Sequence, residues 1–234
     1  MKNVICCGLA VLDHVFYLPE IPKTPIKSFA TNYHPVGGGN AATAAVALSR
    51  AGGQAVFWGR LGDDQNGDLI LSELEAFGVD IRDVPRLPGV KSSVSSVLID
   101  AAGERLITNY IDRQLINNAD WLPLDKLVES SAVLADLRWQ EGALKTLSRA
   151  RELGIPAVLD ADLVPEGLNE DVIKNATHVL FSEPALNEFA AGKSIYEALH
   201  SVAEMNRGWV GVTEGSSGTR WLHDGKLSHL PAFE

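Results

Sequence analysis

The sequence has little cysteine. Only two cysteines occur among 234 residues, and they are neighbours, Cys6 and Cys7. Adjacent side chains of a strand point to opposite faces of a sheet, so these two thiols cannot close a structural disulfide. A disulfide-stabilised secreted scaffold is therefore excluded, and we expect a cytoplasmic protein.

Positive charge and long apolar runs are also scarce. Lys and Arg number 20 against 30 Asp and Glu, which gives a formal net charge of -10 with no basic block to offset it. We therefore expect no nucleic-acid partner and no membrane partner. The first apolar run meets Asp13 well before membrane-spanning length and reads as a buried strand, not a signal peptide. The six histidines show no ligand spacing, so no zinc site is expected.

Short apolar runs alternate with stretches of helical spacing along the rest of the chain. This alternation is typical of a doubly wound α/β fold with a mostly parallel sheet covered on both faces. The chain carries no repeat or linker, so we expect one domain over residues 1–234. The predicted strands lie at 4–9, 55–59, 132–135, 157–160, 178–181 and 209–212, with a final hairpin around Asp224-Gly225, and the predicted helices lie at 41–50, 67–77, 143–153, 168–174, 185–191 and 195–205.

Two regions depart from this alternation. Four prolines and an alternating character predict extended edge strands from Tyr17 to Pro35. Residues 91–110 alternate, turn at Asp100–Gly103 and alternate again, which predicts a hairpin. We expect these regions, about 14–35 and 90–112, to form a small β-lid beside the main sheet.

A glycine cluster, Gly37-Gly38-Gly39, runs directly into a helix of small residues that begins near Ala41. Such a turn lets a ligand approach backbone N–H groups at the positive end of a helix, although it can equally serve a tight turn with close helix packing. A dinucleotide-binding fingerprint requires a strand just before the glycine turn. Residues 30–35 are polar and end in proline, so we do not interpret the glycine cluster as this fingerprint. The Gly-Lys-Ser stretch around Lys193 is not a P-loop, because it lacks the first glycine of that motif and follows a helix instead of a strand.

Polar residues stand where predicted strands end. Asp13 follows the first strand, Asp160 and Asp162 a later one, and Arg138 another. In parallel sheets these ends frame the ligand crevice, so the carboxylates could hold sugar hydroxyls or hydrated Mg²⁺. Helix capping, or an ion pair of Arg138 with a nearby acidic residue (Asp136 or Glu141), is the competing explanation for these residues.

Two further segments carry candidate ligand contacts. Asn109 closes the second strand of the hairpin and could reach the crevice from the lid, or cap a turn. Thr213 opens a turn with Gly215 and Gly218, where a phosphate chain could lie. The competing interpretation of that turn is a connection into the final hairpin.

Together these features resemble the ribokinase-like (PfkB) family of ATP-dependent sugar kinases. The resemblance lies in the glycine signature from Gly38 to Ala45, continued by Gly52 and Gly62, and in the Gly-Asp-Asp stretch that ends at Gly67. It covers essentially the whole chain. The stretches 107–110, 134–139 and 181–184 look most like the sulfofructose kinases within this family.

The resemblance implies phosphorylation of 6-deoxy-6-sulfofructose at its C1 hydroxyl, with ATP and Mg²⁺. Arg138 would pair with the sulfonate, which needs a fixed cation once it leaves water. Asn109 would donate to the same end of the sugar. The remaining implied contacts are Asp13, Gly38, Gly39, Asn40 and Thr43 to the sugar, Ser182, Thr213, Gly215 and Gly218 to ATP, and Asp162 and Glu183 to the metal through water.

Three departures from the family pattern qualify this expectation. The signature has Asn where this chain has Thr43, so one sugar contact could be lost or rebuilt by Asn40. The Asn-x-x-Glu motif linked to magnesium should lie at 182–186, where no Asn and Glu keep that spacing. The Gly-Ala-Gly-Asp motif with the general base would begin just after residue 234. We therefore expect the chain as written to lack the last part of the fold, including this base, and to be almost inert.

Two alternatives remain open. The first keeps the chemistry and changes the sugar to fructose, fructose phosphate or 2-keto-3-deoxygluconate. The second is a non-catalytic sugar-binding protein that ends at Glu234. We also expect a homodimer in which lid strands of two subunits pair edge to edge, because residues 91–110 alternate in an exposed fashion.

Overall fold

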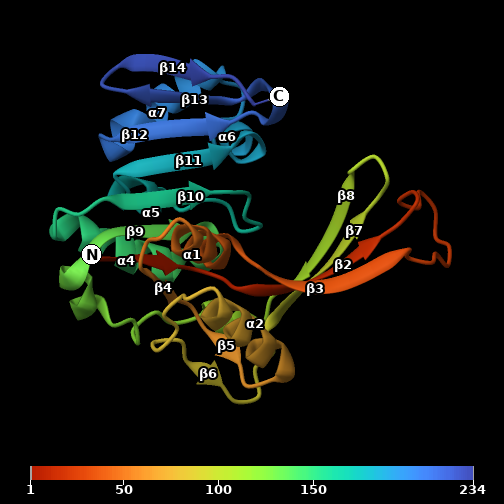
Figure 1. Cartoon of the computed structure of the whole chain (residues 1–234). Helices are drawn as coiled ribbons and strands as arrows, with labels where there is room; N and C mark the ends of the chain where they lie inside the picture. The colour runs from red at the N-terminus through yellow and green to blue at the C-terminus, as the bar shows by residue number, and fades with distance from the viewer. Residues whose placement is uncertain (1, 234) are drawn as a thin grey trace.

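The computed structural model describes residues 2–233, and its main feature is an eight-stranded sheet in the order β14-β13-β12-β11-β10-β9-β1-β4 (Figure 1). The strands from β4 to β12 in this order pair in parallel, and β13 and β14 are antiparallel additions at one edge. The predicted α/β class with a mostly parallel sheet is confirmed. The strands are β1 (Asn3–Cys7), β4 (Ala55–Trp58), β9 (Ser130–Asp136), β10 (Ala157–Ala161), β11 (His178–Ser182), β12 (Trp209–Thr213), β13 (Thr219–His223) and β14 (Lys226–Leu230).

Two apolar cores lie on opposite faces of this sheet. In β1 the side chains of Ile5 and Cys7 belong to one core and that of Cys6 to the other. The two thiols therefore point away from each other, as the strand period requires.

The helices are α1 (Asn40–Arg50), α2 (Gln65–Ala76), α3 (Arg113–Ile116), α4 (Gln140–Glu152), α5 (Glu170–Asn175), α6 (Glu183–Phe189) and α7 (Ile195–Asn206), with 3₁₀ segments η1 (Leu124–Glu129), η2 (Leu137–Trp139) and η3 (Gly215–Ser217).

A second, four-stranded sheet in the order β3-β2-β7-β8 projects from this body as the lid (Figure 1). Its strands are β2 (Val11–Tyr17), β3 (Asn32–Gly38), β7 (Ser93–Ile99) and β8 (Arg105–Tyr110). The strands β7 and β8 form the antiparallel hairpin expected from the alternation in this region. At its turn the Asp100 carboxylate accepts the N–H groups of Ala102 and Glu104 at 2.9 and 3.0 Å.

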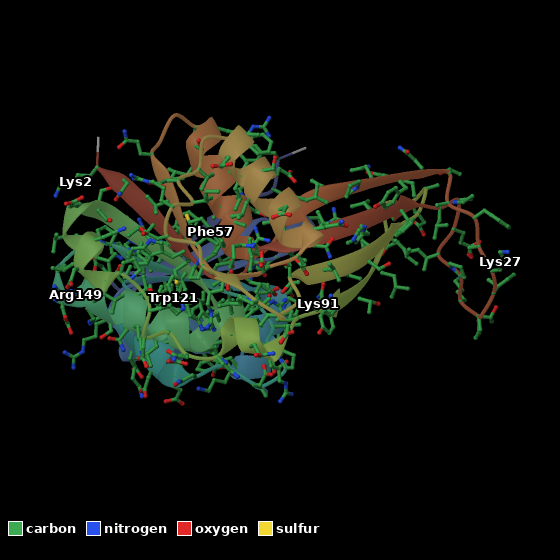
Figure 2. The ribbon with its side chains drawn as sticks, turned by 90° about the horizontal axis from the view of Figure 1, so that it is seen from below. Lys2, Lys27, Phe57, Lys91, Trp121 and Arg149 are labelled. Carbon is green, nitrogen blue, oxygen red and sulfur yellow. The ribbon has the colours of Figure 1, made fainter. Side chains whose placement is uncertain are left out.

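The predicted edge strands from Tyr17 to Pro35 are wrong in their middle part. The strand β2 ends at Tyr17, β3 begins at Asn32, and the residues between them form no strand. Three prolines in this connection have no N–H to give to a sheet, so the segment forms an irregular loop instead. Figure 2 shows Lys27 on this loop, at the far tip of the lid.

The position of Asp13 is also corrected. The first strand ends at Cys7, and Asp13 lies within the lid strand β2 instead of at the end of β1. The chain changes sheets at Gly8, where a Cβ atom would lie 2.2 Å from Oδ2 of Asp136. A run of apolar letters cannot reveal such a change of sheet, because both strands are buried.

The short pair β5 (Leu61–Gly62) and β6 (Arg86–Leu87) and the helix α3 were not predicted. Elements of two to four residues are too short to show a period. None of the helices within residues 2–233 has the length and apolar character needed to cross a bilayer.

Candidate functional site

A cleft of about 230 Å³ lies between the lid and the carboxyl edge of the parallel strands. Its walls come from the lid strands β2, β7 and β8, from the turn into α1, and from the loops that follow β9 and β10. The carboxyl ends of parallel strands are the usual ligand-binding edge of an open α/β sheet. The polar side chains that line the cleft are Asp13, Asn40, Ser95, Asn109, Tyr110, Arg138 and Asp162.

The lid contributes a row of three polar side chains. Asp13 of β2 is paired with Ser95 of β7, and Ser95 with Asn109 of β8, so all three lie on the same face of the lid. The Ser95 hydroxyl donates to Oδ1 of Asn109 at 2.7 Å. The apolar side chains of Val97 and Ile107 flank this row in the cleft. Ser95 was missed in the sequence, although its register opposite Asn109 in the predicted hairpin could have indicated it.

The glycine run has a structural reason at two positions. A Cβ atom on Gly38 would lie 2.2 Å from Oδ2 of Asp13, so the carboxylate sits directly over this glycine. Gly39 has a φ of 93°, a conformation that favours glycine, and a Cβ there would lie 2.3 Å from the carbonyl oxygen of Leu9. Gly38 ends the lid strand β3 against the Asp13 carboxylate, and Gly39 lets the chain pass close to the backbone of Leu9 and begin α1 at the cleft.

Asn40, the first residue of α1, reaches the strand ends. Its Nδ2 donates to Oδ2 of Asp160 at 2.8 Å. Burial raises the pKa of Asp160, an effect that the hydrogen bond from Asn40 opposes and the nearby charge of Asp162 reinforces. The Asp160 carboxylate is thus a half-buried acceptor at the edge of the cleft.

Arg138 enters the cleft from η2, directly after β9. Its Nη2 lies 3.3 Å from Oδ2 of Asp162, while Oδ1 of Asp162 accepts the Ser182 hydroxyl at 2.9 Å. The ion-pair partner of Arg138 is therefore Asp162, and not Asp136 or Glu141, which are nearer in sequence. About a quarter of the Arg138 side chain remains exposed, so the guanidinium can still meet a ligand.

Asp136, the last residue of β9, is buried beneath the cleft at 1% exposure. Its carboxylate accepts three backbone N–H groups, those of Leu9 at 3.1 Å, Ala41 at 3.0 Å and Arg138 at 2.9 Å. Burial raises the pKa of Asp136 to about 6, against the effect of these hydrogen bonds. Sequence reasoning missed this role, and the signal available was an acidic residue inside the apolar stretch 133–137.

The remaining predicted residues fall into two groups. Thr43 lies outside the cleft, one turn further along α1, where it lines a separate hollow between α1, α2 and β3. Gly38 lines the same hollow, so this geometry supports the predicted sugar contacts through neither Thr43 nor Gly38. The predicted ATP contacts follow the same sheet edge, since Ser182 and Thr213 are paired at the ends of β11 and β12 and Gly215 and Gly218 bound the turn beyond.

Among residues 2–233, no group of three or more His, Cys, Asp or Glu is placed to hold a metal ion. Both oxygens of Asp162 are already engaged, by Arg138 and by Ser182. Mg²⁺ usually keeps several waters and binds through one or two carboxylates and the phosphates of its substrate, so the carboxylates at this edge are compatible with a metal that the nucleotide carries.

Comparison with known proteins gives one consistent class. Residues 1–234 match the family described as pfkB family carbohydrate kinase. A fructokinase from Vibrio alginolyticus is 28% identical over 238 residues, covering 93% of this chain and 72% of the relative. A ribokinase from Bacillus subtilis is 25% identical, covering 100% of this chain and 78% of the relative.

Solved structures with a similar fold include ribokinases. A candidate ribokinase from Agrobacterium tumefaciens superposes with a TM-score of 0.94 at 34% identity, covering 100% of this chain and 77% of that one. The Arabidopsis thaliana ribokinase, solved with ribose and ATP, has a TM-score of 0.81 at 19% identity, with 98% of this chain and 78% of that one covered. The chain belongs to the pfkB family of carbohydrate kinases.

Proposed function

We propose that the cleft binds 6-deoxy-6-sulfofructose, and that the enzyme transfers the γ-phosphoryl group of ATP to the C1 hydroxyl of this sugar. The bond between the C1 oxygen and the γ-phosphorus forms, the bond from the γ-phosphorus to the β–γ bridging oxygen breaks, ADP leaves, and the hydroxyl proton is released. Family membership supports the phosphoryl transfer from ATP to a sugar. The sulfonated substrate is the finer part of the proposal.

The observation that carries the finer part is the position of Arg138. A fixed, partly exposed guanidinium stands in the cleft wall, and Asn109 stands on the opposite lid wall of the same cleft. A sulfonate that leaves water needs a cation and additional donors, and a guanidinium offers both in one rigid group. Asp13 and Gly39, which line the same cleft, would bind sugar hydroxyls.

The nucleotide would lie further along the sheet edge, over Ser182, Thr213 and the turn from Gly215 to Gly218. Phosphoryl transfer depends mostly on positioning and on neutralising charge, and Mg²⁺ bound to ATP supplies part of that neutralisation. Asp162 and Glu183 would meet the metal through water, because Asp162 already accepts two protein donors. Two buried thiols and a nucleotide substrate fit a cytoplasmic enzyme.

Fructose is a second candidate, and one observation favours it. Asp162 already pairs with Arg138, so the cation is partly neutralised before any ligand enters. A neutral ketose would then bind by hydrogen bonds alone, and one of the relatives is a fructokinase. The two candidates differ in whether Arg138 meets an anion.

Calorimetric titration of the 234-residue chain with 6-deoxy-6-sulfofructose and with fructose tests the proposal. The titration measures the affinity of the cleft for each sugar and does not depend on proton transfer. We expect Arg138→Ala to weaken binding of the sulfonated sugar about 10- to 100-fold, the range of a charge-assisted hydrogen bond, and to change fructose binding much less. Arg138→Lys keeps the positive charge but loses the planar pair of N–H donors, so the loss of affinity for the sulfonated sugar should be intermediate.

Arg86→Ala is the matched control. Arg86 has a similarly exposed side chain and also pairs with carboxylates, Asp63 and Asp68, but it lies outside the cleft. This variant should leave both affinities unchanged. Equal losses for the two sugars in Arg138→Ala would refute the sulfonate assignment, and tighter binding of fructose by the unmodified protein would favour the second candidate. Sugar binding that added ATP leaves unchanged would favour the sugar-binding protein.

A further inference from the structure

The buried carboxylate of Asp136 is hydrogen-bonded to three segments that meet at the cleft. Leu9 belongs to the link between β1 and the lid, Ala41 to the first turn of α1, and Arg138 to η2. Leu9 and Ala41 are 127 and 95 positions from Asp136 in sequence. One side chain therefore connects three parts of the chain that approach the cleft from different directions.

Each of these segments carries a side of the cleft. Leu9 lines it directly, Asn40 precedes Ala41 and reaches Asp160, and the side chain of Arg138 extends into it. Because these three backbone N–H groups are held in place, the backbone positions from which the side chains of Leu9, Asn40 and Arg138 extend are also held in place. The bonded oxygens are specific: Oδ2 accepts from Leu9 and Ala41, and Oδ1 accepts from Arg138. A carboxylate can accept all three N–H groups, whereas an amide at this position would turn an NH₂ group toward N–H donors.

We infer that Asp136 is a positioning residue of the sugar site, which holds the lid link, the start of α1 and the Arg138 loop in the arrangement that binds the sugar. The inference rests on the proposed function, because it assigns the cleft to the sugar. Asp136 itself lies beneath the cleft and does not line it. Its effect on the ligand therefore acts through the segments that it holds.

The crowding around Asp136 shows that the arrangement leaves little freedom. A Cβ atom on Gly8 would lie 2.2 to 2.6 Å from three atoms of the carboxyl group. The carboxylate therefore packs directly against the backbone where the chain leaves β1 for the lid. A rotation of this side chain would break the hydrogen bonds that it accepts from all three segments.

The test combines two readouts on Asp136→Asn. Hydrogen exchange resolved at single amides reports whether Leu9, Ala41 and Arg138 are held, with or without sugar. Titration with 6-deoxy-6-sulfofructose and with fructose reports the consequence for binding. We expect faster exchange at the amides that face the new NH₂ group, either Arg138 or the pair Leu9 and Ala41, and a 10- to 100-fold weaker affinity for the sugar that the unmodified protein binds.

The matched control is Asn206→Ala. Asn206 is equally buried, at 1% exposure, and accepts the Gly208 N–H at 3.0 Å near the start of β12, at the other end of the strands. It should lower the melting temperature without changing sugar affinity. An equal loss of sugar affinity in this control would show a general folding effect and would overturn the inference.

The outcomes separate this inference from the proposed function. Unchanged exchange at the three amides in Asp136→Asn would overturn the positioning role, whatever the sugar result. Faster exchange with unchanged sugar affinity would overturn the link to the site. Failure of the unmodified protein to bind either sugar would refute the proposed function and, with it, the assignment of Asp136 to a sugar site, while the exchange data would still decide whether Asp136 holds the three segments.

Discussion

Gly38→Ala tests the arrangement of the lid over the glycine turn. Gly38 is the last residue of β3, and its added Cβ would lie 2.2 Å from Oδ2, 2.9 Å from Cγ and 3.3 Å from Oδ1 of Asp13. Contacts this short force the Asp13 carboxylate or the strand to move. Overpacking of this kind typically costs about 1–3 kcal/mol of the free energy of unfolding. In a chain of this length such a loss lowers the melting temperature by about 2–12 °C.

Urea unfolding of a double-mutant cycle measures the effect. We expect Asp13→Ala to remove most of the penalty of Gly38→Ala, because the clash is with that side chain, so the two changes should couple strongly. Sugar affinity should fall in Gly38→Ala, since the carboxylate that would bind the hydroxyls is displaced.

Gly37→Ala provides the comparison. A Cβ atom there would lie 2.9 Å from Oε2 of Glu73, the far end of a flexible side chain that can move aside. The cost should therefore be smaller than at Gly38. Equal stability of the unmodified protein and Gly38→Ala, or additive effects of Gly38→Ala and Asp13→Ala, would refute the proposed placement of Asp13 over the glycine.

Two further predictions concern pH and assembly. Burial raises the pKa of Asp136 to about 6, so the folded protein binds a proton more tightly than the unfolded chain. As pH rises from about 4 to 6, Asp136 should therefore lower the free energy of unfolding by about 3 kcal/mol. Denaturation at several pH values should show this slope as the difference between the unmodified protein and Asp136→Asn, and parallel curves would contradict it. Leu106 of β8 is 49% exposed, and Leu106→Glu should convert the proposed lid-mediated homodimer to monomers in light scattering. The matched change Leu69→Glu, at a 52% exposed position on α2, should not do so, and a monomeric unmodified protein would refute the dimer.

The main sheet and its helices could be predicted because their sequences carry the required periods. Runs such as 132–135 and 178–181 are buried on both faces and read as continuous apolar strands, and α1 follows directly from a glycine turn. The hairpin β7–β8 could be predicted because it alternates around a turn of Asp and Gly. The loop between β2 and β3 could not, since alternation among prolines looks extended whether or not a partner strand exists.

The candidate site was predictable in part. The sequence indicated Arg138 and Asp162 because polar residues at the ends of parallel strands face the ligand-binding edge. Asn109 was indicated because it closes the lid hairpin, and Asn40 was indicated by the resemblance to the family signature. Asp13 was selected for a wrong reason, because the sequence does not show that the chain leaves the main sheet at Gly8 and enters the lid.

By itself, the sequence determined the order of the main-sheet strands and the helices between them, the glycine turn, and the charged residues available at the strand ends. Only the tertiary structure decided that Arg138 pairs with Asp162, that Thr43 lies outside the cleft, and that Asp136 holds Leu9 and Ala41. The physical reason is that local patterns record which face of an element is buried. The partner of a buried polar group depends on which distant segments packing brings within 3 Å of it.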